Sequence, residues 1–436
     1  MNEWIIRGGT VIDPSAGIFE KKNLWLKDGR IFMVYGPDEV PEGSLGVPEF
    51  DADGMWVMPG LIDLHVHFRD PGLTYKETVA TGSRAAAAGG FTVVCAMPNT
   101  KPVTDTPEIV EYVKNEGEKA GLTRVLPIGA VTVGQIGKEM TDYAALKVAG
   151  ACAVSEDGRS VADAGLMKRA MIACREAGMP IFDHCEEEKL AGGVMNEGEV
   201  SRKLGLKGLS RDAENTMTAR EILLAASTGA QLHICHVSTK ECVEMIRFAK
   251  AQGIPVTAEV GPHHFSLTDE AFLEELHSKY KMNPPLRTPA DVEAMKEGLA
   301  DGTIDAIATD HAPHSAEEKT ADVVKSANGI IGLETAFAVS KTVLVDGGVL
   351  TPLELVEKMS LNPARILGLP LGTLSEGARA DICIADPEES YVVGEEFHSK
   401  ASNSPYVGKT LTGRVKATFF GGRPVYNNGK IVEEDR

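Results

Sequence analysis

The sequence lacks long hydrophobic runs. No apolar stretch among its 436 residues approaches the roughly 20 residues that a helix needs to span a bilayer. The first residues, Met1-Asn2-Glu3-Trp4, contain no basic segment followed by an apolar core, so no secretory signal is visible. We therefore expect a cytoplasmic protein that does not insert into a membrane.

Basic residues are scarce relative to acidic ones. The chain has 44 Lys and Arg against 63 Asp and Glu, which gives a net charge of −19. This balance disfavours nucleic acid and anionic membrane surfaces as partners, because both carry negative charge themselves. A small anionic substrate is still compatible with it, since one or two arginines determine the field at a binding site.

Paired cysteine motifs are also missing. The seven cysteines are odd in number, have no Cys-x-x-Cys spacing and lie mostly in apolar stretches. This pattern predicts buried free thiols rather than a disulfide framework. With 43% hydrophobic and 25% charged residues, the composition is typical of a folded globular protein with a sizeable core.

Short β-type runs alternate with helical segments along the middle of the chain. The segments between the runs have the periodicity of amphipathic helices, for example at 218–225 and 243–250. Eight such units over about 310 residues predict an α/β fold, a (β/α)₈ TIM-type barrel. The eight β-type runs begin at Leu61, Phe91, Val125, Ala151, Ile181, Leu232, Val256 and Ile304.

Both chain ends contain β-type runs without helices. They lie at 4–7, 23–26 and 31–34 in the N-terminal part, and at 381–385, 415–420 and 424–426 in the C-terminal part. Neither part is large enough to bury a core alone, so we expect both to form one small β-sandwich. The predicted domains are therefore 1–55 (sandwich, N-terminal part), 56–368 (barrel) and 369–436 (sandwich, C-terminal part).

The stretch from Leu61 to Arg69 is the first candidate functional segment. Its alternation of apolar and polar residues has the period of a strand, so His65, His67 and Arg69 should point to the same side. Neutral imidazoles are good ligands for Zn-like ions, and arginine can hold a carboxylate through two hydrogen bonds. In most proteins, the side chains of an isolated His-x-His in a strand only pack against their neighbours. This stretch alone therefore does not establish a metal site.

Metal-capable residues follow four further predicted strands. Catalytic groups of (β/α)₈ barrels lie at the C-terminal ends of the strands. Scattered structural histidines have no reason to prefer these positions, so the joint pattern predicts a metal centre. The residues concerned, besides His65 and His67, are Glu156, Asp157, Asp183, His184, His233, Cys235, His236, Asp310 and His311.

Five motifs complete this pattern: LHVHFRDPG at 64–72, AMPNT at 96–100, HVST at 236–239, KMNPPLR at 281–287 and TDHAPH at 309–314. Together they resemble the motifs of the amidohydrolase superfamily and, within it, of the bacterial class I dihydroorotases. The resemblance extends over nearly the whole chain, including the split β-sandwich. It implies metal-dependent, reversible cyclisation of N-carbamoyl-L-aspartate to (S)-dihydroorotate plus water, in de novo pyrimidine (UMP) biosynthesis.

The resemblance also implies a ligand set. His65, His67 and Asp310 would bind one metal ion, His184 and His236 a second, and Asp157 would bridge them. The implied cofactor is Zn²⁺, one or two ions per subunit, with two favoured. Many relatives use a carboxylated lysine as the bridge, but here the nearest lysine precedes Asp157 by ten residues, which favours the aspartate. Asp310 is also the implied catalytic group, which takes the proton of the attacking water and passes it to the leaving amide nitrogen.

Substrate contacts follow from the same resemblance. Arg69 and Asn99 would bind the substrate carboxylate with help from His314, while Asn283 would bind the ring. His67 is implied next to the substrate as well. Relatives use backbone groups of an aromatic-Gly pair where this chain has Asn328 and Gly329, so only the backbone contact is expected to persist. The implied partners are a second copy of the chain, in a homodimer or larger homo-oligomer, and aspartate transcarbamoylase as a candidate.

Two alternatives stay open at the level of the sequence. Another cyclic amidase, a hydantoinase or allantoinase, would share the barrel and the metal ions, although Arg69, Asn99 and Asn283 favour a ring that bears a carboxylate. A catalytically silent, dihydroorotase-like scaffold for aspartate transcarbamoylase would be expected to lose metal ligands, and all six positions are filled here. The roles of three further histidines stay undecided, namely His263, His264 and His311.

Overall fold

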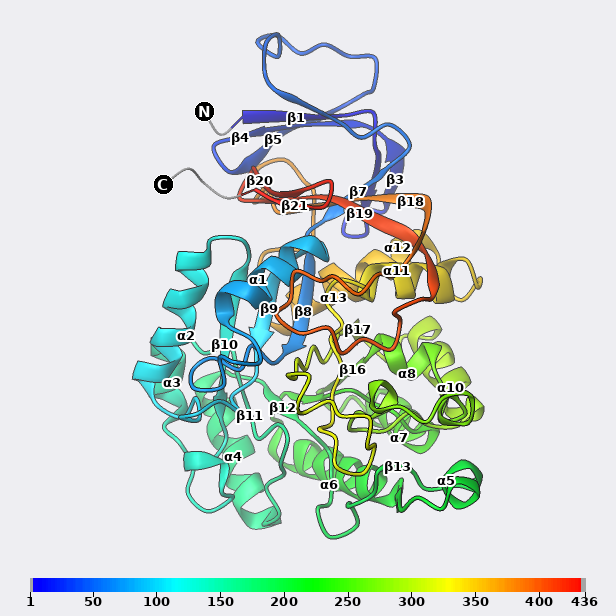
Figure 1. Ribbon diagram of the computed structural model, residues 1–436. Coiled ribbons are helices and arrows are strands. Elements are labelled where there is room, and N and C mark those ends of the chain that lie inside the picture. The colour runs from blue at the N-terminus through cyan, green and yellow to red at the C-terminus, as the bar shows by residue number, and fades with distance from the viewer. Residues whose placement is uncertain (1–2, 433–436) are drawn as a thin grey trace.

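The structure is a computed structural model and describes residues 3–432 (Figure 1). It consists of a parallel barrel surrounded by helices, with two smaller sheets stacked at one end of it. Among the described helices, none combines the length and the apolar character that crossing a membrane requires.

The barrel contains eight parallel strands in the order in which they occur along the chain. An isolated bridge between Val66 and His311 connects the first strand to the segment after the last one, so the barrel is nearly closed. Every strand begins within two residues of its predicted start, and the predicted (β/α)₈ fold is confirmed. The strands are β8 (Leu61–Val66), β9 (Phe91–Ala96), β10 (Arg124–Ala130), β11 (Ala153–Ser155), β12 (Ile181–Asp183), β15 (Leu232–Ile234), β16 (Val256–Val260) and β17 (Ala306–Ile307).

Helices cover the outside of the barrel (Figure 1). Side chains of Thr78, Asp163 and Thr239 accept backbone N–H groups at three helix starts, which satisfies donors that lack partners within the helix. The longer helices are α1 (Val79–Ala88), α2 (Pro107–Ala120), α3 (Tyr143–Ala149), α4 (Ala164–Ala177), α6 (Asp212–Thr228), α7 (Lys240–Ala251) and α10 (Pro289–Ala300). Shorter ones are α5 (Glu199–Leu204), α8 (Pro262–Ser266), α9 (Ala271–Glu274), α11 (Ala336–Ser340), α12 (Pro352–Val356) and α13 (Asn362–Ile366).

A β-sandwich is stacked on the N-terminal end of the barrel strands (Figure 1). Residues such as Ile6, Leu24, Ile384 and Phe419 pack between its two sheets, so the predicted sandwich from both chain ends is confirmed. One sheet is β5 (Arg30–Tyr35), β4 (Asn23–Lys27), β1 (Glu3–Arg7) and β6 (Glu49–Asp51). The other is β21 (Lys430–Ile431), β20 (Arg423–Asn427), β19 (Thr410–Phe420), β18 (Ile382–Val392), β7 (Trp56–Pro59), β2 (Thr10–Asp13) and β3 (Ile18–Lys21).

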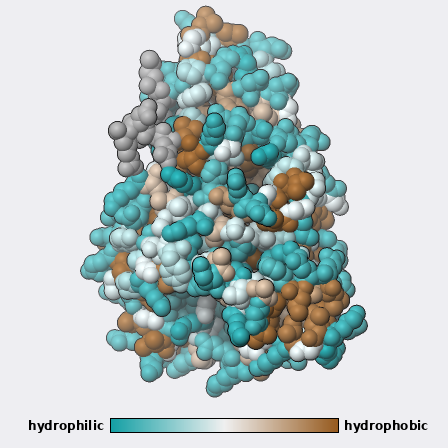
Figure 2. Space-filling view, viewed as in Figure 1, coloured by the Kyte–Doolittle hydropathy of each residue, from teal (hydrophilic) through white to brown (hydrophobic). Residues whose placement is uncertain are grey.

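The sandwich is joined to the barrel without a linker, since β7 pairs with β18 and leads through Gly60 directly into β8. The domain boundaries at residues 55 and 369 stay predictions. All seven cysteines are free thiols and six of them are buried, as expected from their spacing. The face shown in Figure 2 is predominantly hydrophilic, with hydrophobic side chains in separate patches.

Candidate metal centre

The six predicted metal ligands lie together at the C-terminal end of the barrel strands. His65 is in β8, and the other five follow the ends of β8, β11, β12, β15 and β17 by one to three residues. All six side chains are buried. The ends of parallel strands share one rim of the barrel, which is why residues up to 245 positions apart converge here.

Asp157 is at the centre of the group. Its Oδ1 lies 3.3 Å from His65 Nε2, 3.6 Å from His184 Nδ1 and 3.7 Å from His236 Nε2. Its Oδ2 lies 3.5 Å from His67 Nε2. One carboxylate thus reaches four imidazoles, and Asp157 has the position that a bridging ligand requires.

Asp310 faces the two histidines of β8. Its Oδ1 lies 3.1 Å from His67 Nε2 and 3.6 Å from His65 Nε2. On the other side of the group, His184 Nδ1 and His236 Nε2 are 2.8 Å apart. Three sets of three donor atoms are close enough to hold an ion, and two of them consist of predicted ligands: His65, His67 and Asp310, and His65, Asp157 and His236. The third set is His65, Cys235 and Glu259.

Hydrogen bonds show which ring nitrogens are free to bind an ion. His65 Nδ1 lies 2.8 Å from Glu259 Oε1, and His67 Nδ1 lies 2.9 Å from Asn99 Oδ1. Both oxygens can only accept, so each Nδ1 carries a proton, and in the neutral imidazole that binds a metal ion each Nε2 has a lone pair. These lone pairs face the oxygens of Asp157 and Asp310. Acceptors facing acceptors in a buried site are unfavourable unless a cation lies between them, so the residues fit a metal ion.

Unpartnered atoms support the same conclusion. The Nε2 atoms of His65 and His184 are buried without a hydrogen-bond partner among the described residues. Buried polar atoms without partners are rare in folded proteins. Neutral imidazoles and carboxylates are also the donors that Zn²⁺ prefers in catalytic sites.

The electrostatics of the group favour added positive charge. Burial disfavours the charged form of Asp310, but a hydrogen bond to His67 and the field of the nearby imidazoles outweigh it and lower the pKa of Asp310 to about 2. Burial also opposes charging of His65, yet Asp157 outweighs it and raises the pKa of that imidazole. The carboxylates therefore stay ionised and stabilise a cation at this position.

Three site residues have strained backbone conformations. Arg69, His236 and Asp310 have φ values of 61°, 33° and 48°, a left-handed region that residues with a side chain seldom adopt. Only three other non-glycine residues in 3–432 do so, so half of the cases lie in this group. Such strain is retained where the surrounding structure holds side chains in a required direction.

Arg69 lies at the rim of the metal centre, next to His314. Its Nε donates to Pro313 O at 3.4 Å, and its Nη2 is 3.4 Å from His314 Nε2. Burial together with the charges of Arg69 and Lys76 lowers the pKa of His314 to about 3, so this imidazole is neutral near pH 7. Asn99 contacts the candidate ligands directly, because its Nδ2 also donates to Asp157 Oδ2 at 3.2 Å.

The other predicted substrate residues are near the same rim. Asn283 Nδ2 donates to Glu186 Oε2 at 2.9 Å, while its Oδ1 is buried without a hydrogen-bond partner among the described residues. The carbonyl oxygen of Asn328 accepts from His314 Nε2 at 2.8 Å. Gly329 has a φ of 124°, and an added Cβ would lie 2.7 Å from the Cβ of Ala312, which explains glycine at this position.

Glu259 is a functional candidate that the sequence analysis missed. Its Oε1 bonds His65 Nδ1 and its Oε2 bonds His233 Nε2 at 3.0 Å. A carboxylate behind a ligand imidazole fixes its tautomer and orientation. The available signal was the alternation within β16, which places Glu259 on the side opposite Ala258 and Val260, facing the barrel interior.

Asp63 is a second missed residue, and it connects the first strand to the last. It accepts from the backbone N–H groups of His65 and Thr309 and from the Thr309 hydroxyl. Burial raises the pKa of Asp63 to about 7 in spite of these bonds. Because Thr309 directly precedes Asp310, Asp63 holds the two sides of the candidate metal centre together.

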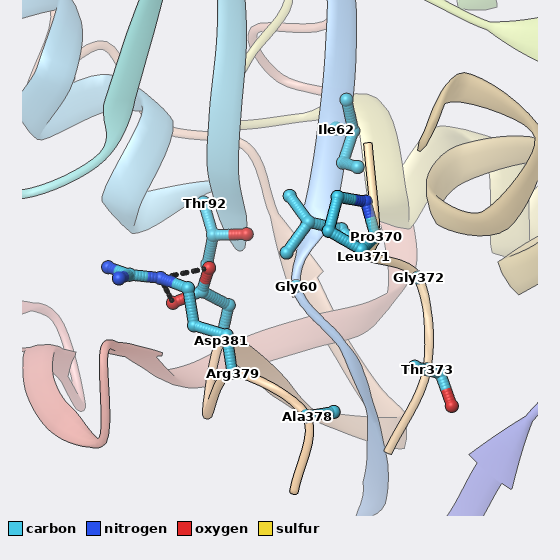
Figure 3. A pocket seen from close by; sticks show the side chains of 10 residues that line it. All are labelled: Gly60, Ile62, Thr92, Pro370, Leu371, Gly372, Thr373, Ala378, Arg379 and Asp381. Carbon is cyan, nitrogen blue, oxygen red and sulfur yellow. Dashed lines mark hydrogen bonds and ion pairs between the residues drawn. The ribbon is translucent and has the colours of Figure 1, made fainter. Parts of the chain in front are cut away.

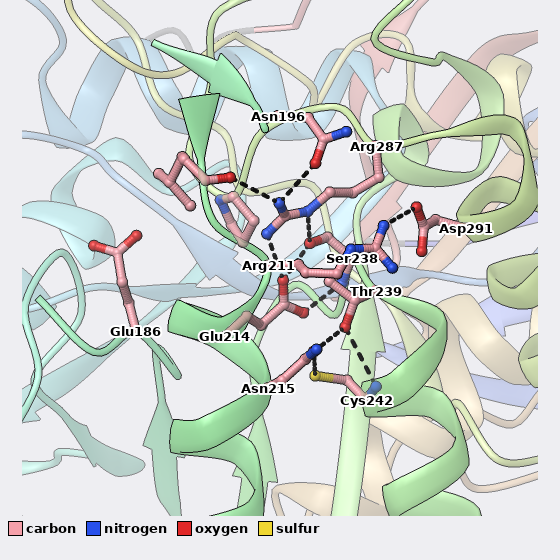
Figure 4. Close-up of polar contacts among 12 residues, drawn as sticks. Glu186, Asn196, Arg211, Glu214, Asn215, Ser238, Thr239, Cys242, Arg287 and Asp291 are labelled. Carbon is pink, nitrogen blue, oxygen red and sulfur yellow. Dashed lines mark hydrogen bonds and ion pairs between the residues drawn. The ribbon is translucent and has the colours of Figure 1, made fainter. Parts of the chain in front are cut away.

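The segment after His236 rests on a buried arginine (Figure 4). Arg287, at the end of the KMNPPLR motif, donates to Ser238 Oγ at 3.0 Å, Asn196 Oδ1 at 3.0 Å and Glu214 Oε2 at 3.2 Å. Glu214 also accepts from Ser238 N at 2.8 Å. The network fixes the chain two residues beyond His236 and so positions that imidazole.

Two of the three undecided histidines have hydrogen-bond partners, and the third packs against one of them. His264 Nε2 bonds Pro284 O at 3.1 Å. His311 points away from the centre and lies 3.5 Å from Glu77 Oε2, while its Nδ1 accepts from Gly332 N. His263 is buried against His264, with ring centroids 4.1 Å apart, and burial lowers the pKa of His263 to about 4.

Known proteins resemble this chain along its whole length. A family model described as dihydro-orotase-like matches residues 54–242. A dihydroorotase of Pelotomaculum thermopropionicum is 52% identical over 98% of this chain and 99% of its own length. A dihydroorotase of Anaeromyxobacter sp. (strain K) is 50% identical, with 98% of each chain covered.

Solved structures share the arrangement of barrel and sandwich. An L-hydantoinase from Arthrobacter aurescens superimposes with a TM-score of 0.87 at 28% identity, covering 100% of this chain and 98% of its own. A dihydropyrimidinase from Brevibacillus agri gives a TM-score of 0.83 at 22% identity, covering 99% of this chain and 96% of its own, which shows a common fold.

Proposed function

The chain belongs to the dihydroorotase family, and on this premise we propose how its barrel rim carries out the reaction. The chain is a cyclic amide hydrolase (EC 3.5.2.3) that interconverts N-carbamoyl-L-aspartate and (S)-dihydroorotate plus water. The observation that carries the proposal is the group of four histidines and two aspartates, in which imidazole lone pairs face ionised carboxylates next to a buried arginine.

The proposed cofactor is Zn²⁺, with one or two ions per subunit and two favoured. One ion would be held by His65, His67 and Asp310. The other would be held by His184 and His236, and Asp157 would contribute to both sites. When bound, these ions supply Lewis-acid activation of a water molecule and of the ring carbonyl. The contacts of Asp157 with four imidazoles support the bridging role.

Asp310 is the proposed proton carrier. Its low pKa keeps it ionised near neutral pH, so it can accept a proton as the water oxygen attacks the ring amide carbon. The same proton then goes to the amide nitrogen as the carbon–nitrogen bond breaks, which gives the carbamoyl and carboxyl groups of the open product. In the biosynthetic direction these steps reverse, and Asp310 takes the proton from the nitrogen that closes the ring.

Arg69 is the proposed anchor for the substrate carboxylate. A guanidinium group can donate two parallel hydrogen bonds to a carboxylate, and the burial of Arg69 strengthens such a contact. We propose that Asn99 and His314 assist, that His67 borders the substrate, and that Asn283, with its unpartnered Oδ1, binds the ring. Backbone groups of Asn328 and Gly329 complete the proposed pocket.

One comparison of substrates tests the proposal. Purified protein is analysed for bound metal and then assayed for hydrolysis of dihydroorotate, hydantoin and allantoin. We expect bound zinc and a kcat/KM for dihydroorotate well above that for the two rings without a carboxylate. Bound metal with no turnover of dihydroorotate would contradict the proposal, and preferred turnover of hydantoin or allantoin would favour a different cyclic amidase.

The proposed assembly is a homodimer or larger homo-oligomer, with aspartate transcarbamoylase as a candidate partner. Light scattering of the purified chain tests the homo-oligomer, and light scattering of its mixture with that enzyme tests the partner. A monomer in the first sample would contradict the homo-oligomer, and the absence of a larger complex in the second would contradict the partner.

A further inference from the structure

A cleft lined by arginines lies between the sandwich and the barrel. Its cationic residues come from four places in the chain: the start of β5, the start of β10, the segment before β18 and the start of β20. We call the set Arg30, Arg124, Arg379 and Arg423 the arginine cleft. The cleft has a volume of about 670 Å³. A neighbouring pocket of about 480 Å³ shares Arg124, Arg379 and Arg423 and extends to Lys114 on α2.

The arginine cleft is separate from the candidate metal centre. Arg124 is the first residue of β10, whereas the metal centre lies beyond the C-terminal ends of the strands. A strand rises about 3.3 Å per residue, so the seven residues of β10 place the two sites roughly 20 Å apart. The proposed reaction uses none of the residues of the cleft.

The charge of the arginine cleft is opposite to that of the whole chain. The chain carries a net charge of −19. In contrast, five cationic side chains of residues 3–432 line the cleft and its neighbouring pocket, against two acidic ones, Asp28 and Glu118. A concave surface that carries charge of one sign concentrates ions of the opposite charge.

Three of the four arginines are held in place by the protein. Arg379 Nε bonds both carboxylate oxygens of Asp381 at 2.9 and 2.8 Å, and its guanidinium carbon is 4.6 Å from the centre of the Phe420 ring. Figure 3 shows this ion pair beside a small adjoining cavity. Arg30 Nη1 donates to Gly377 O at 2.7 Å, and Arg423 Nη2 donates to Gly121 O. Each guanidinium has five N–H donors, so these bonds leave further donors of Arg30 and Arg379 available.

Arg124 has no such partner. Within residues 3–432, no hydrogen bond or ion pair of its guanidinium is formed. Burial lowers the pKa of Arg124, and the positive charge of Arg379 lowers it further, with Asp381 acting against both. Arginine stays protonated in proteins, so Arg124 cannot escape the cost of burial and the repulsion by Arg379 through loss of its proton. An anion bound between the two guanidinium groups would relieve it.

We propose that the arginine cleft binds a compact polyanion, the di- or triphosphate group of a small molecule such as a nucleoside triphosphate. One arginine is enough for a carboxylate, whereas four guanidinium groups from separate elements match the many oxygens of linked phosphates. The volume of the neighbouring pocket leaves room for an organic group attached to the phosphates. Arg124 belongs to the barrel and the other three arginines flank the sandwich, so the ligand stabilises the contact between the two.

Calorimetric titration tests the proposal, with inorganic triphosphate and ATP as the two probes. The wild-type protein is compared with Arg124→Gln and Arg30→Gln. Arg124 makes no hydrogen bond and Arg30 is exposed, so neither change should disturb folding. Arg202→Gln, an exposed arginine on α5, is the control of equal charge. Dihydroorotate hydrolysis, which uses neither Arg124 nor Arg30, verifies that each variant is folded.

We expect saturable binding of at least one probe to the wild type and a rise in its melting temperature, because a ligand that binds only the folded state stabilises it. Both cleft variants should bind at least about tenfold more weakly, and Arg202→Gln should bind as the wild type does. Tighter binding of ATP than of triphosphate assigns the neighbouring pocket to the nucleoside, and equal binding assigns recognition to the phosphates alone.

Metal chelation by the probes is controlled separately. Triphosphate and ATP also bind metal ions, so the zinc content of every protein is measured after the titration. Heat that depends on bound zinc but not on Arg124 would come from the metal centre. That result, an absence of saturable binding to the wild type, or equal affinity of the wild type and Arg124→Gln would each overturn the proposal.

Discussion

The two ends of the barrel present opposite kinds of unmatched charge. At the C-terminal rim, imidazole lone pairs face the carboxylates of Asp157 and Asp310, so acceptors are in excess and a cation is needed. At the other end, Asp381 pairs with Arg379, whereas the guanidinium group of Arg124 has no partner of its own among residues 3–432 and is repelled by Arg379, so donors are in excess there and favour an anion. The sign of the unmatched groups therefore indicates the class of ligand before any ligand is identified.

Removal of metal ions should have the largest effect and should separate the two ends. Treatment with a strong chelator followed by desalting should abolish dihydroorotate hydrolysis, and added Zn²⁺ should restore it. Triphosphate binding at the arginine cleft should persist in the chelated protein, since no metal ligand lies there. Full activity of a protein shown to be free of metal would refute the role of the metal centre.

Asp310→Asn should have the next largest effect. Asparagine cannot accept the proton of the attacking water, so kcat should fall by about 10²- to 10⁴-fold. The zinc content is measured in parallel, because the same substitution removes a proposed ligand. Near-normal turnover with zinc still bound would show that another group carries the proton.

Arg69→Lys should reduce kcat/KM for dihydroorotate by about 10- to 100-fold, mainly through KM. Lysine keeps the charge but cannot donate two parallel hydrogen bonds to the carboxylate. Any residual hydrolysis of hydantoin, which has no carboxylate, serves as the internal control and should change little. An unchanged KM for dihydroorotate would place the carboxylate elsewhere.

Glu259→Gln should weaken zinc binding by about 10- to 100-fold. The amide oxygen can still accept from His65 Nδ1, so the substitution removes mainly the negative charge behind the imidazole. Competition with a chromophoric chelator measures the affinity, and Glu111→Gln, an exposed residue of α2, is the control. Equal zinc affinity of the two variants would reduce Glu259 to a packing role.

Arg124→Gln should have the smallest effect, on stability. It removes a cation that repels Arg379 and has no partner, so the free energy of unfolding should stay within about 0.5 kcal/mol of the wild type or rise slightly. Arg379→Gln should instead lower it by about 1–2 kcal/mol, because Asp381 is buried and loses its charged partner, although it still accepts from Gly421 N. Urea denaturation at low ionic strength measures the free energy of unfolding of both variants. A larger loss for Arg124→Gln than for Arg379→Gln would show that Arg124 makes a stabilising contact within the protein.

The place of the candidate metal centre could be predicted because its residues are tied to strand ends. The register of side chains in β8 directs His65 and His67 to one side, and Asp157, His184, His236 and Asp310 follow other strands closely. Glu259 could not be selected in this way, since an acidic residue within a strand gives no local sign that it lies behind His65. The contact of Asn99 with the substrate stays a prediction, and the structure adds its contacts with His67 and Asp157.

The sequence by itself determined the barrel, the sandwich and the residues at the strand ends. The periodicity of apolar residues and the turn residues that predict these features are local, because they depend only on residues close together along the chain. Only the tertiary structure decided which distant groups meet, and that the guanidinium group of Arg124 has no hydrogen-bond partner among residues 3–432. Arg30, Arg124, Arg379 and Arg423 are spread over nearly 400 positions and follow no common pattern. Their convergence depends on how the sandwich packs on the barrel, and so does the unmatched charge between them.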